Sequence, residues 1–278
     1  MKKSLFLSIG ILISLSLFGQ EETEYVHGLF RGTHIISGQS AETQRTGELD
    51  LFIAHRFGRL NSGFYEWFGL DQASMRLGFD YGITDWLAVG VGRSTAGKEY
   101  DSFIKARILR QSNKMPISMT WASRMYVDGS APLETQPLLF RHRLSYSNQL
   151  MIARKFNDRF SAQVMPTHVH LNLVDSVGQP NDLFSLGVAG KVQLTKNLAL
   201  TAEYYLTPDQ FLLTNTTRPL SIGFDINTGN HVFQIHLTNA SGMQEKALIT
   251  DTNGSWAAGD IQFGFNMVRT FKLKGTRY

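Results

Sequence analysis

Two histidines separated by a single residue, His168 and His170, are the first candidates for chemistry in this chain. On a β-strand they would project from the same face, about 6.5–7 Å apart, and with a third ligand they could bind a metal ion. Pro166 lies two residues earlier and indicates an irregular strand end. A polar pair at the rim of a sheet is the simpler interpretation, so we predict no metal ligands and no cofactor.

A serine hydrolase acting on lipid is the second possibility. Ser221 and His236 would face the same side of one hairpin, so that the hydroxyl could approach the imidazole. The third group, which would orient the histidine, is missing, because Asp225 lies four residues along the strand from Ser221. The chain also lacks a Gly-x-Ser-x-Gly motif. We therefore predict an ordinary polar pair, no catalytic residues and no enzyme activity.

A set of charged residues shares one parity along the predicted strands and would face the inside of a barrel. The cations are Arg56, Arg76, Lys105, Arg107, Arg124, Arg141, Arg143 and Lys191, and the anions are Glu48, Asp50, Asp80, Glu203 and Asp225. This modest basic excess would favour anionic solutes if the lumen is an aqueous pore. Alternatively, arginines and carboxylates pair across the lumen and close it, since they form bidentate pairs readily. Both interpretations remain open.

Segments of about ten residues must position these side chains, and in each of them apolar residues alternate with small, polar or charged ones. We predict twelve such strands, at 48–57, 73–81, 86–94, 102–110, 117–127, 141–153, 160–171, 184–193, 198–206, 220–228, 231–239 and 261–271. Alternation with period two places one set on each face of a strand. An apolar face toward lipid and a polar face toward the lumen is typical of outer-membrane barrels.

The connections between these segments alternate strictly between short and long, which argues against a soluble β-sandwich. The short ones are 82–85, 111–116, 154–159, 194–197 and 229–230, and the long ones are 58–72, 95–101, 128–140, 172–183, 207–219 and 240–260. Tight turns on one rim and long loops on the other are typical of membrane barrels, whose short rim lies in the periplasm. The fold class is therefore all-β, a single antiparallel transmembrane β-barrel of about twelve strands at residues 48–273.

The N-terminus predicts export. Lys2 and Lys3 precede an apolar run over 5–18, which is typical of a signal peptide at 1–19 that is cleaved after Gly19. Together with the barrel pattern, this predicts the outer membrane of a diderm bacterium. The sequence contains no cysteine, which excludes disulfides and cysteine-based chemistry. Its formal net charge of +4 falls to +2 without the two lysines, and this near-neutral charge does not indicate a nucleic-acid partner.

Residues 20–47 precede the first clear strand and include Ile35 and Ile36. They could form a periplasmic lead, a lumen plug or an extra strand, and an even strand count favours the lead or the plug. The longest connection, 240–260, is expected either to fold into the lumen or to meet a partner. Residues 274–278 are expected to be a C-terminal tail.

Several motifs resemble one known family. They are His27-Gly28-Leu29-Phe30, Gly47-Glu48-Leu49-Asp50-Leu51, His55-Arg56-Phe57-Gly58 with Asn61-Ser62-Gly63-Phe64, and Tyr81-Gly82-Ile83-Thr84-Asp85-Trp86. Together they resemble the uncharacterised outer-membrane barrel family of the Bacteroidota called domain of unknown function 5777, from about residue 27 to 273. The resemblance implies a barrel in the outer membrane and brings no substrate or catalytic residue.

The function predicted from the sequence is a pore or transport-related channel with a mixed-charge, mildly basic lumen. The alternative is a closed structural barrel that acts as a scaffold or partner subunit of an envelope complex, and a lipid-active enzyme is less favoured. The expected partners are outer-membrane lipid and either small solutes or an envelope protein.

Overall fold

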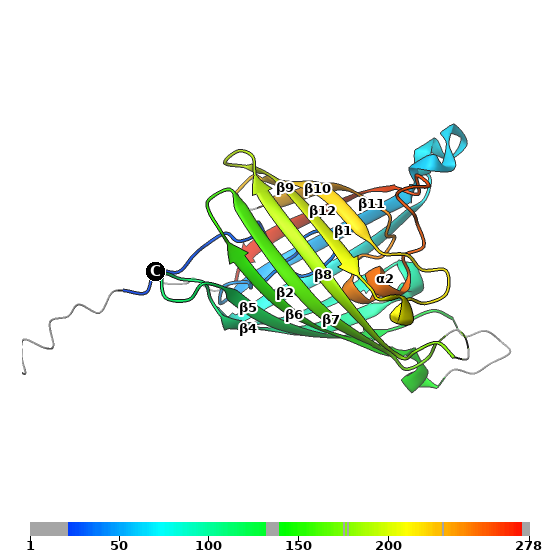
Figure 1. The fold of residues 1–278 in the computed structure, drawn as a ribbon, viewed down its shortest axis with the longest axis horizontal. Helices are drawn as coiled ribbons and strands as arrows, with labels where there is room; N and C mark the ends of the chain where they lie inside the picture. Colours follow the sequence, from blue (N-terminus) through cyan, green and yellow to red (C-terminus); the bar gives the residue numbers. More distant parts are fainter. Residues whose placement is uncertain (1–21, 132–138, 175, 177, 230, 274–278) are drawn as a thin grey trace, which may run out of the picture.

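The computed structural model describes residues 22–131, 139–174, 176, 178–229 and 231–273. The predicted signal peptide and C-terminal tail lie outside the described residues. Within them, twelve antiparallel strands form one closed barrel, in which each strand pairs with its neighbours in sequence and β1 pairs with β12 (Figure 1). The strands are β1 (Glu48–Arg59), β2 (Ala73–Thr84), β3 (Leu87–Ser94), β4 (Tyr100–Leu109), β5 (Ser118–Val127), β6 (Leu144–Lys155), β7 (Phe160–Leu171), β8 (Asp182–Gln193), β9 (Leu198–Leu206), β10 (Leu220–Asn227), β11 (His231–Thr238) and β12 (Gln262–Lys272).

The helical elements are all short and lie in the long connections. They are the 3-10 segments η2 (Leu60–Ser62), η3 (Phe64–Gly69), η4 (Ala96–Lys98), η5 (Phe140–Arg143) and η6 (Asp209–Phe211), and the α-helix α2 (Glu245–Thr250). Among the described residues, no helix has the length and apolar character needed to cross a membrane. The predicted twelve-stranded, all-β barrel is confirmed.

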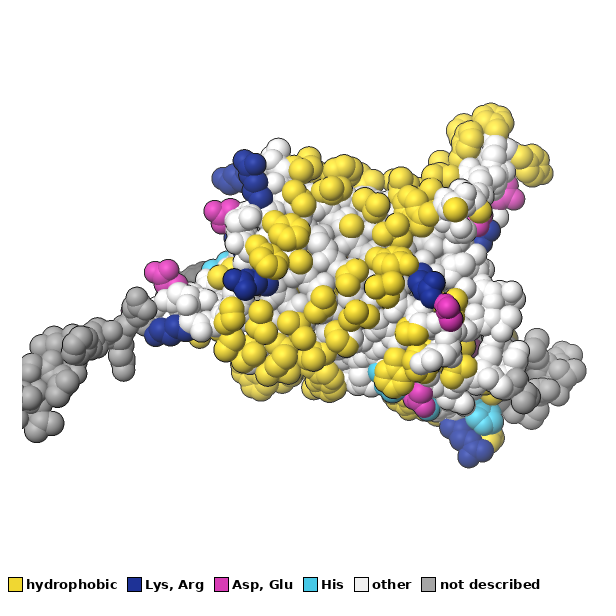
Figure 2. Space-filling model, in the orientation of Figure 1, with side chains coloured by type: hydrophobic (Ala, Val, Ile, Leu, Met, Phe, Trp, Pro, Cys, Tyr) yellow, Lys and Arg dark blue, Asp and Glu magenta, His cyan; other side chains and the backbone are white. Residues whose placement is uncertain are grey.

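Alternation along the strands determines which side chains enter the lumen. In β8, Leu183, Ser185 and Lys191 are buried inside, whereas Phe184 and Leu186 are exposed on the outside. On the face of the barrel seen in Figure 2, apolar side chains predominate between the two ends, and the visible charged side chains lie toward the ends. Such a surface is suited to the hydrocarbon layer of a membrane.

Six predicted strand starts differ from the structure by one to three residues, and two of these differences change which charged residues face the lumen. The strand predicted to begin at residue 141 begins at Leu144, the first residue of β6 that pairs with β5, and Arg141 and Arg143 lie in η5 before it. The strand predicted to begin at residue 102 begins at Tyr100, which pairs with Arg93 and Val127. In each case the neighbouring strand decides where the ladder starts.

Two segments of the chain occupy the lumen. Residues 22–47 enter from the short-turn rim and make isolated bridges only, so they add no strand to the described barrel. The connection between β11 and β12 enters from the opposite rim and carries α2, which lies within the barrel in Figure 1. Leu29, Phe30 and Ile35 of the first segment belong to the same buried apolar cluster as Leu248 and Ile249 of α2. The core of this protein therefore lies inside the barrel.

Candidate functional site

A tight turn formed by residues 33–40, which we call the lumen hairpin, lies across the middle of the lumen. His34 and Gln39 form an isolated antiparallel bridge, and Ile35 N donates to Gly38 O at 2.8 Å. Both isoleucines of the turn are fully buried. A side chain at Gly38 has no room, because a Cβ built there would lie 2.2 Å from the hydroxyl oxygen of Tyr205. Glycine thus allows the hairpin to press against the β9 wall.

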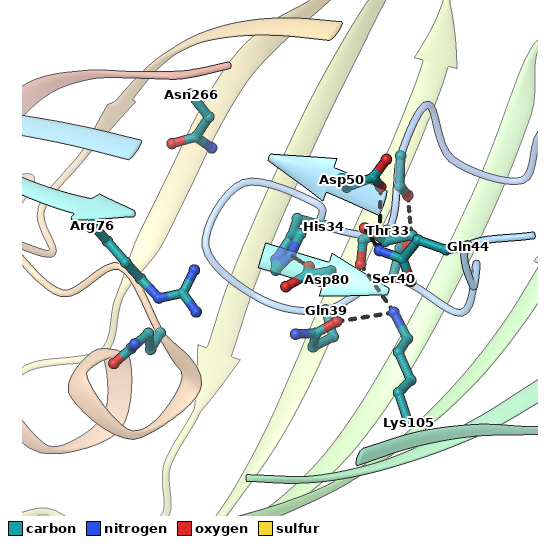
Figure 3. Close-up of polar contacts among 12 residues, drawn as sticks. Thr33, His34, Gln39, Ser40, Gln44, Asp50, Arg76, Asp80, Lys105 and Asn266 are labelled. Carbon is teal, nitrogen blue, oxygen red and sulfur yellow. Dashed lines mark hydrogen bonds and ion pairs between the residues drawn. The ribbon is translucent and has the colours of Figure 1, made fainter. Parts of the chain in front are cut away.

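The β4 side of the lumen holds the hairpin through a lysine. The ammonium group of Lys105 donates to the backbone oxygen of Thr33 at 3.0 Å and to the side-chain oxygen of Gln39 at 2.9 Å (Figure 3). Lys105 is completely buried. The charge is therefore solvated by the hairpin in place of water, which makes the contact specific for this turn.

The β9 side holds the tip of the same turn through a carboxylate. Glu203 accepts hydrogen bonds from the backbone N–H groups of Ser37 at 2.8 Å and Gly38 at 3.0 Å. The guanidinium of Arg56 on β1 donates to the Ser37 hydroxyl at 2.7 Å. Lys105 and Glu203 thus do not pair directly, and the hairpin lies between them and binds both.

The β1–β2 side contributes an aromatic and an acidic contact. The imidazole of His34 stacks on Phe52 with ring centroids 4.3 Å apart, and its Nε2 lies 3.0 Å from a carboxylate oxygen of Asp80. In Figure 3 the His34 and Asp80 side chains point toward each other. On β12, the amide nitrogen of Asn266 donates to the backbone oxygen of Ile36 at 2.7 Å. The hairpin is therefore bound on every side.

A second cluster of charges holds the connection between β11 and β12, residues 239–261, which we call the outer segment. Asp101 on β4 accepts from Arg76 at 2.7 Å and from Arg124 at 2.5 Å, and Arg124 Nε lies 3.2 Å from Glu245 of α2. The Gln244 side chain also donates to Asp101. These buried groups neutralise one another, so α2 is fastened to the wall by paired charges.

Two cavities remain on either side of the hairpin, along the same β1–β12 wall. The outer cavity, of about 580 Å³, opens among the long loops and is lined by Arg56, Ser74, Ser241, Asn253 and Gln262 among others. The inner cavity, of about 660 Å³, opens at the short-turn rim and is lined by Thr33, Glu42, Gln44, Asp50, Arg107 and Thr270 among others. Between them, Phe52 is covered by His34 and Asn266 is bonded to Ile36.

Most of the predicted lumen residues lie on the inner face of the described strands and each has a polar partner in the lumen. In addition to the groups above, Arg107 lies 3.3 Å from Glu42, Lys191 donates to Gly28 O, and Asp225 accepts from Thr201 and Gln234. Arg141 and Arg143 are the exceptions, because η5 places them at the long-loop rim, where Arg143 donates to the backbone oxygens of Asp128 and Ser130.

Asp101 is a lumen residue that the sequence analysis missed, because the predicted strand began one residue after it. Its parity matches that of Lys105, and this was the available signal. With Asp101 added and the two η5 arginines removed, the cationic excess on the strand walls disappears. Glu245 was also missed, since no local pattern shows that a loop returns into the barrel.

The two candidate chemical pairs adopt other contacts. The Ser221 hydroxyl donates to the Thr238 hydroxyl at 2.9 Å, and among the described residues the buried imidazole of His236 has no hydrogen-bond partner. His168 and His170 face outward near the long-loop rim, and each lies 2.8 Å from the same oxygen of Asp182. In the part of the chain that the structure describes, no group of three or more potential ligands could hold a metal ion.

Comparison with known proteins identifies the family. The model of the family described as "Membrane bound beta barrel domain (DUF5777)" matches residues 30–271. The chain therefore belongs to the DUF5777 family, and the predicted resemblance is confirmed. The protein is an outer-membrane β-barrel. No curated protein matches the chain.

Two solved structures with a similar fold are porins. The NanC porin in a rhombohedral crystal form is 8% identical with a TM-score of 0.52, over 81% of this chain and 100% of that chain. A KdgM porin in complex with disordered oligogalacturonate is 10% identical with a TM-score of 0.50, over 81% of this chain and 99% of that chain. At these identities the likeness concerns the fold, which is porin-like.

Proposed function

We propose that this protein is an outer-membrane channel for small polar solutes, and that its resting state is closed by the lumen hairpin. Transport then requires the hairpin to leave its place between Lys105 and Glu203. The barrel wall supplies the path, and residues 22–47 act as a plug that belongs to the same chain.

The observation that carries this proposal is the pair of cavities on one wall. The outer and inner cavities open at opposite rims, and both extend along β1 and β12. The lumen hairpin separates them, so displacing one short turn would join two existing vestibules. A barrel that is permanently filled would not require two cavities that are separated by a single turn.

The contacts of the hairpin suit reversible displacement. Its backbone N–H and C=O groups bind Glu203, Lys105 and Asn266, and water can replace each of these partners when the lumen fills. The strand walls carry no cationic excess, so we expect weak charge selectivity. A bound oligogalacturonate in one porin of this fold supports small polar solutes as the ligand class.

A closed structural barrel is the second candidate, and one observation favours it. The hairpin is also attached to an apolar cluster, in which Leu29, Phe30 and Ile35 pack with Met165 of β7 and Leu248 of α2. Burial of a large apolar side chain stabilises by about 1.5–3 kcal/mol. If this cluster never opens, the barrel is a scaffold for another envelope component.

Conductance distinguishes the two candidates. We would compare the wild-type protein with a variant that lacks residues 24–44 in planar bilayers. The channel proposal expects rare openings for the wild type and a persistent conductance for the deletion variant. Heat-modifiability on a gel verifies that each variant is assembled. If an assembled deletion variant conducts no ions, the channel proposal is wrong and the scaffold is favoured.

Thiol labelling measures displacement of the hairpin directly. Because the chain has no cysteine, Ser37→Cys introduces a single reactive group at a position that is 2% exposed. A small methanethiosulfonate reagent should modify Ser37→Cys slowly, at the rate of hairpin opening. Ser62→Cys, in an exposed loop, is the control that should react at once. Complete protection of Ser37→Cys during measured conductance would contradict the gating role.

A further inference from the structure

A further pocket of about 360 Å³ lies at the short-turn rim beside the inner cavity, with which it shares His27, Gly28, Phe30 and Arg31. We call it the rim pocket. It is enclosed by the β6–β7 and β8–β9 turns, by the end of β10 and by the beginning of the N-terminal segment. Its lining includes Arg31, Lys155, Asp158, Lys191, Lys196 and Asn227.

The charges of the rim pocket are strongly unbalanced. Arg31, Lys155, Lys191 and Lys196 are cations, whereas Asp158 is the single carboxylate among the lining residues. Asp158 is fully exposed to solvent and lies 3.4 Å from Lys155. It therefore leaves the remaining cations uncompensated. The charges of Arg31 and Lys155 act unfavourably on Lys191. Two carboxylates outside the pocket lining, Glu42 and Asp225, also act on Lys191, in the opposite sense to Arg31 and Lys155, but neither forms an ion pair with it.

Lys191 is the most informative member of this group. Its side chain is 3% exposed, and its ammonium group donates to the backbone oxygen of Gly28 at 2.6 Å. Among the described residues, no carboxylate lies within ion-pair distance of it. A buried ammonium that has a carbonyl partner and no counter-charge is costly. The site is therefore incomplete until an anion supplies the missing charge.

Arg31 shows the same deficiency. One of its terminal nitrogens donates to the backbone oxygen of Lys196 at 2.5 Å. Its Nε is buried and has no hydrogen-bond partner among the described residues. Arg31 and Lys191 thus retain unused donors, and Lys155 and Lys196 add two further cations to the lining of the same pocket.

We propose that the rim pocket binds a phosphate group of a small soluble molecule. A phosphate offers several strong acceptor oxygens and more than one negative charge, which match an arginine and three lysine point charges better than a single carboxylate does. The pocket is a binding site distinct from the lumen hairpin. Binding is expected whether or not the barrel conducts, so this inference does not rest on the channel proposal.

Calorimetry with pyrophosphate and inorganic phosphate tests the site in detergent-solubilised wild-type protein. The measurement uses low ionic strength, because salt screens exposed charges. We expect saturable binding of both probes, with pyrophosphate tighter. Lys191→Met keeps the buried aliphatic chain and removes the charge, and we expect it to weaken binding by about tenfold or more. Lys196→Gln, at an exposed position, provides a second variant that is expected to fold regardless of Lys191.

Arg154→Gln is the matched control. It removes one positive charge near the same rim, but Arg154 is exposed on the outside of the barrel, where its guanidinium lies over the Phe156 ring. The affinity of the Arg154→Gln variant for both phosphate probes should remain at the wild-type value. No saturable binding to the wild type, or an equal loss in Arg154→Gln and Lys191→Met, would overturn the proposal. To distinguish a soluble phosphate from a lipid headgroup, the titration is repeated in nanodiscs with and without phosphatidylglycerol. If phosphatidylglycerol weakens the binding of pyrophosphate, the proposal of a soluble ligand is overturned and the pocket binds a lipid headgroup.

Discussion

The contact between Gly38 and Tyr205 allows the hairpin position to be tested with a single methyl group. Gly38→Ala would place a Cβ 2.2 Å from the Tyr205 hydroxyl oxygen and 3.1 Å from a Glu203 carboxylate oxygen. Ordinary contacts begin near 3.4 Å, so one of the groups has to move by more than 1 Å. Tyr205 is completely buried, and Gln149 donates to its hydroxyl at 3.2 Å. Its ring therefore has little freedom to retreat.

The expected size of the effect follows from overpacking. Inserting a methyl group into a packed site costs about 1–3 kcal/mol, which corresponds to about a 5- to 150-fold shift from the closed to the displaced hairpin. Single-channel recording should show a matching rise in the open fraction. The thiol-labelling rate of Ser37→Cys should increase by a similar factor in the Gly38→Ala background.

Two further variants test the origin of the effect. Gly32→Ala adds the same methyl group to the same segment, where nothing lies within 4 Å, and should behave as the wild type. Tyr205→Phe removes the clashing oxygen and leaves the ring carbon at 3.4 Å, so it should largely restore closure in the Gly38→Ala background. If Gly38→Ala matches Gly32→Ala in conductance and labelling, the hairpin does not occupy this position and the gating argument fails.

Three other predictions concern the barrel, the outer segment and the short-turn rim. Val91 is exposed on the outer face of β3, so Val91→Arg should cost up to about 2–4 kcal/mol of barrel stability and impair assembly, while Val91→Leu should assemble normally on a heat-modifiability gel. Glu245→Ala removes the partner of Arg124 and should release α2, which limited proteolysis would detect as new cleavage in an assembled barrel; an uncleaved loop would contradict the anchoring role. At the short-turn rim, hydrogen bonds from the backbone N–H and hydroxyl of Thr46 hold the pKa of the Asp85 carboxyl below its usual value of 3.8. Because the folded-state pKa is lowered, the stabilisation by Asp85 is complete above the unfolded value and is lost as the pH falls through the folded value. The melting temperature of Asp85→Asn should therefore lie below that of the wild type at pH 7 and approach it below about pH 3.8; a constant difference would show that Asp85 acts by other means.

The local pattern of the sequence determined the strands and their inner faces. Alternation depends only on neighbouring residues, because successive side chains on a strand point to opposite sides. The inward positions of Arg56, Asp80 and Glu203 could be assigned in this way without any partner strand. The same reasoning failed at the strand starts, since Arg143 has the correct parity but lies before the first residue of β6. Where a strand begins depends on which residues of the adjacent strand remain available for pairing.

The contents of the lumen were decided only by the tertiary structure. The sequence left residues 20–47 as a lead, a plug or a strand, because nothing in that segment shows which wall would bind it. Ser37 meets Glu203 across 166 residues of chain, and Gln244 meets Asp101 across 143. Such contacts depend on shape and on closure of the barrel. The polar residues that alternate along the strands are compatible both with an open pore and with a wall that binds the N-terminal segment. Water or backbone groups can satisfy the same donors and acceptors.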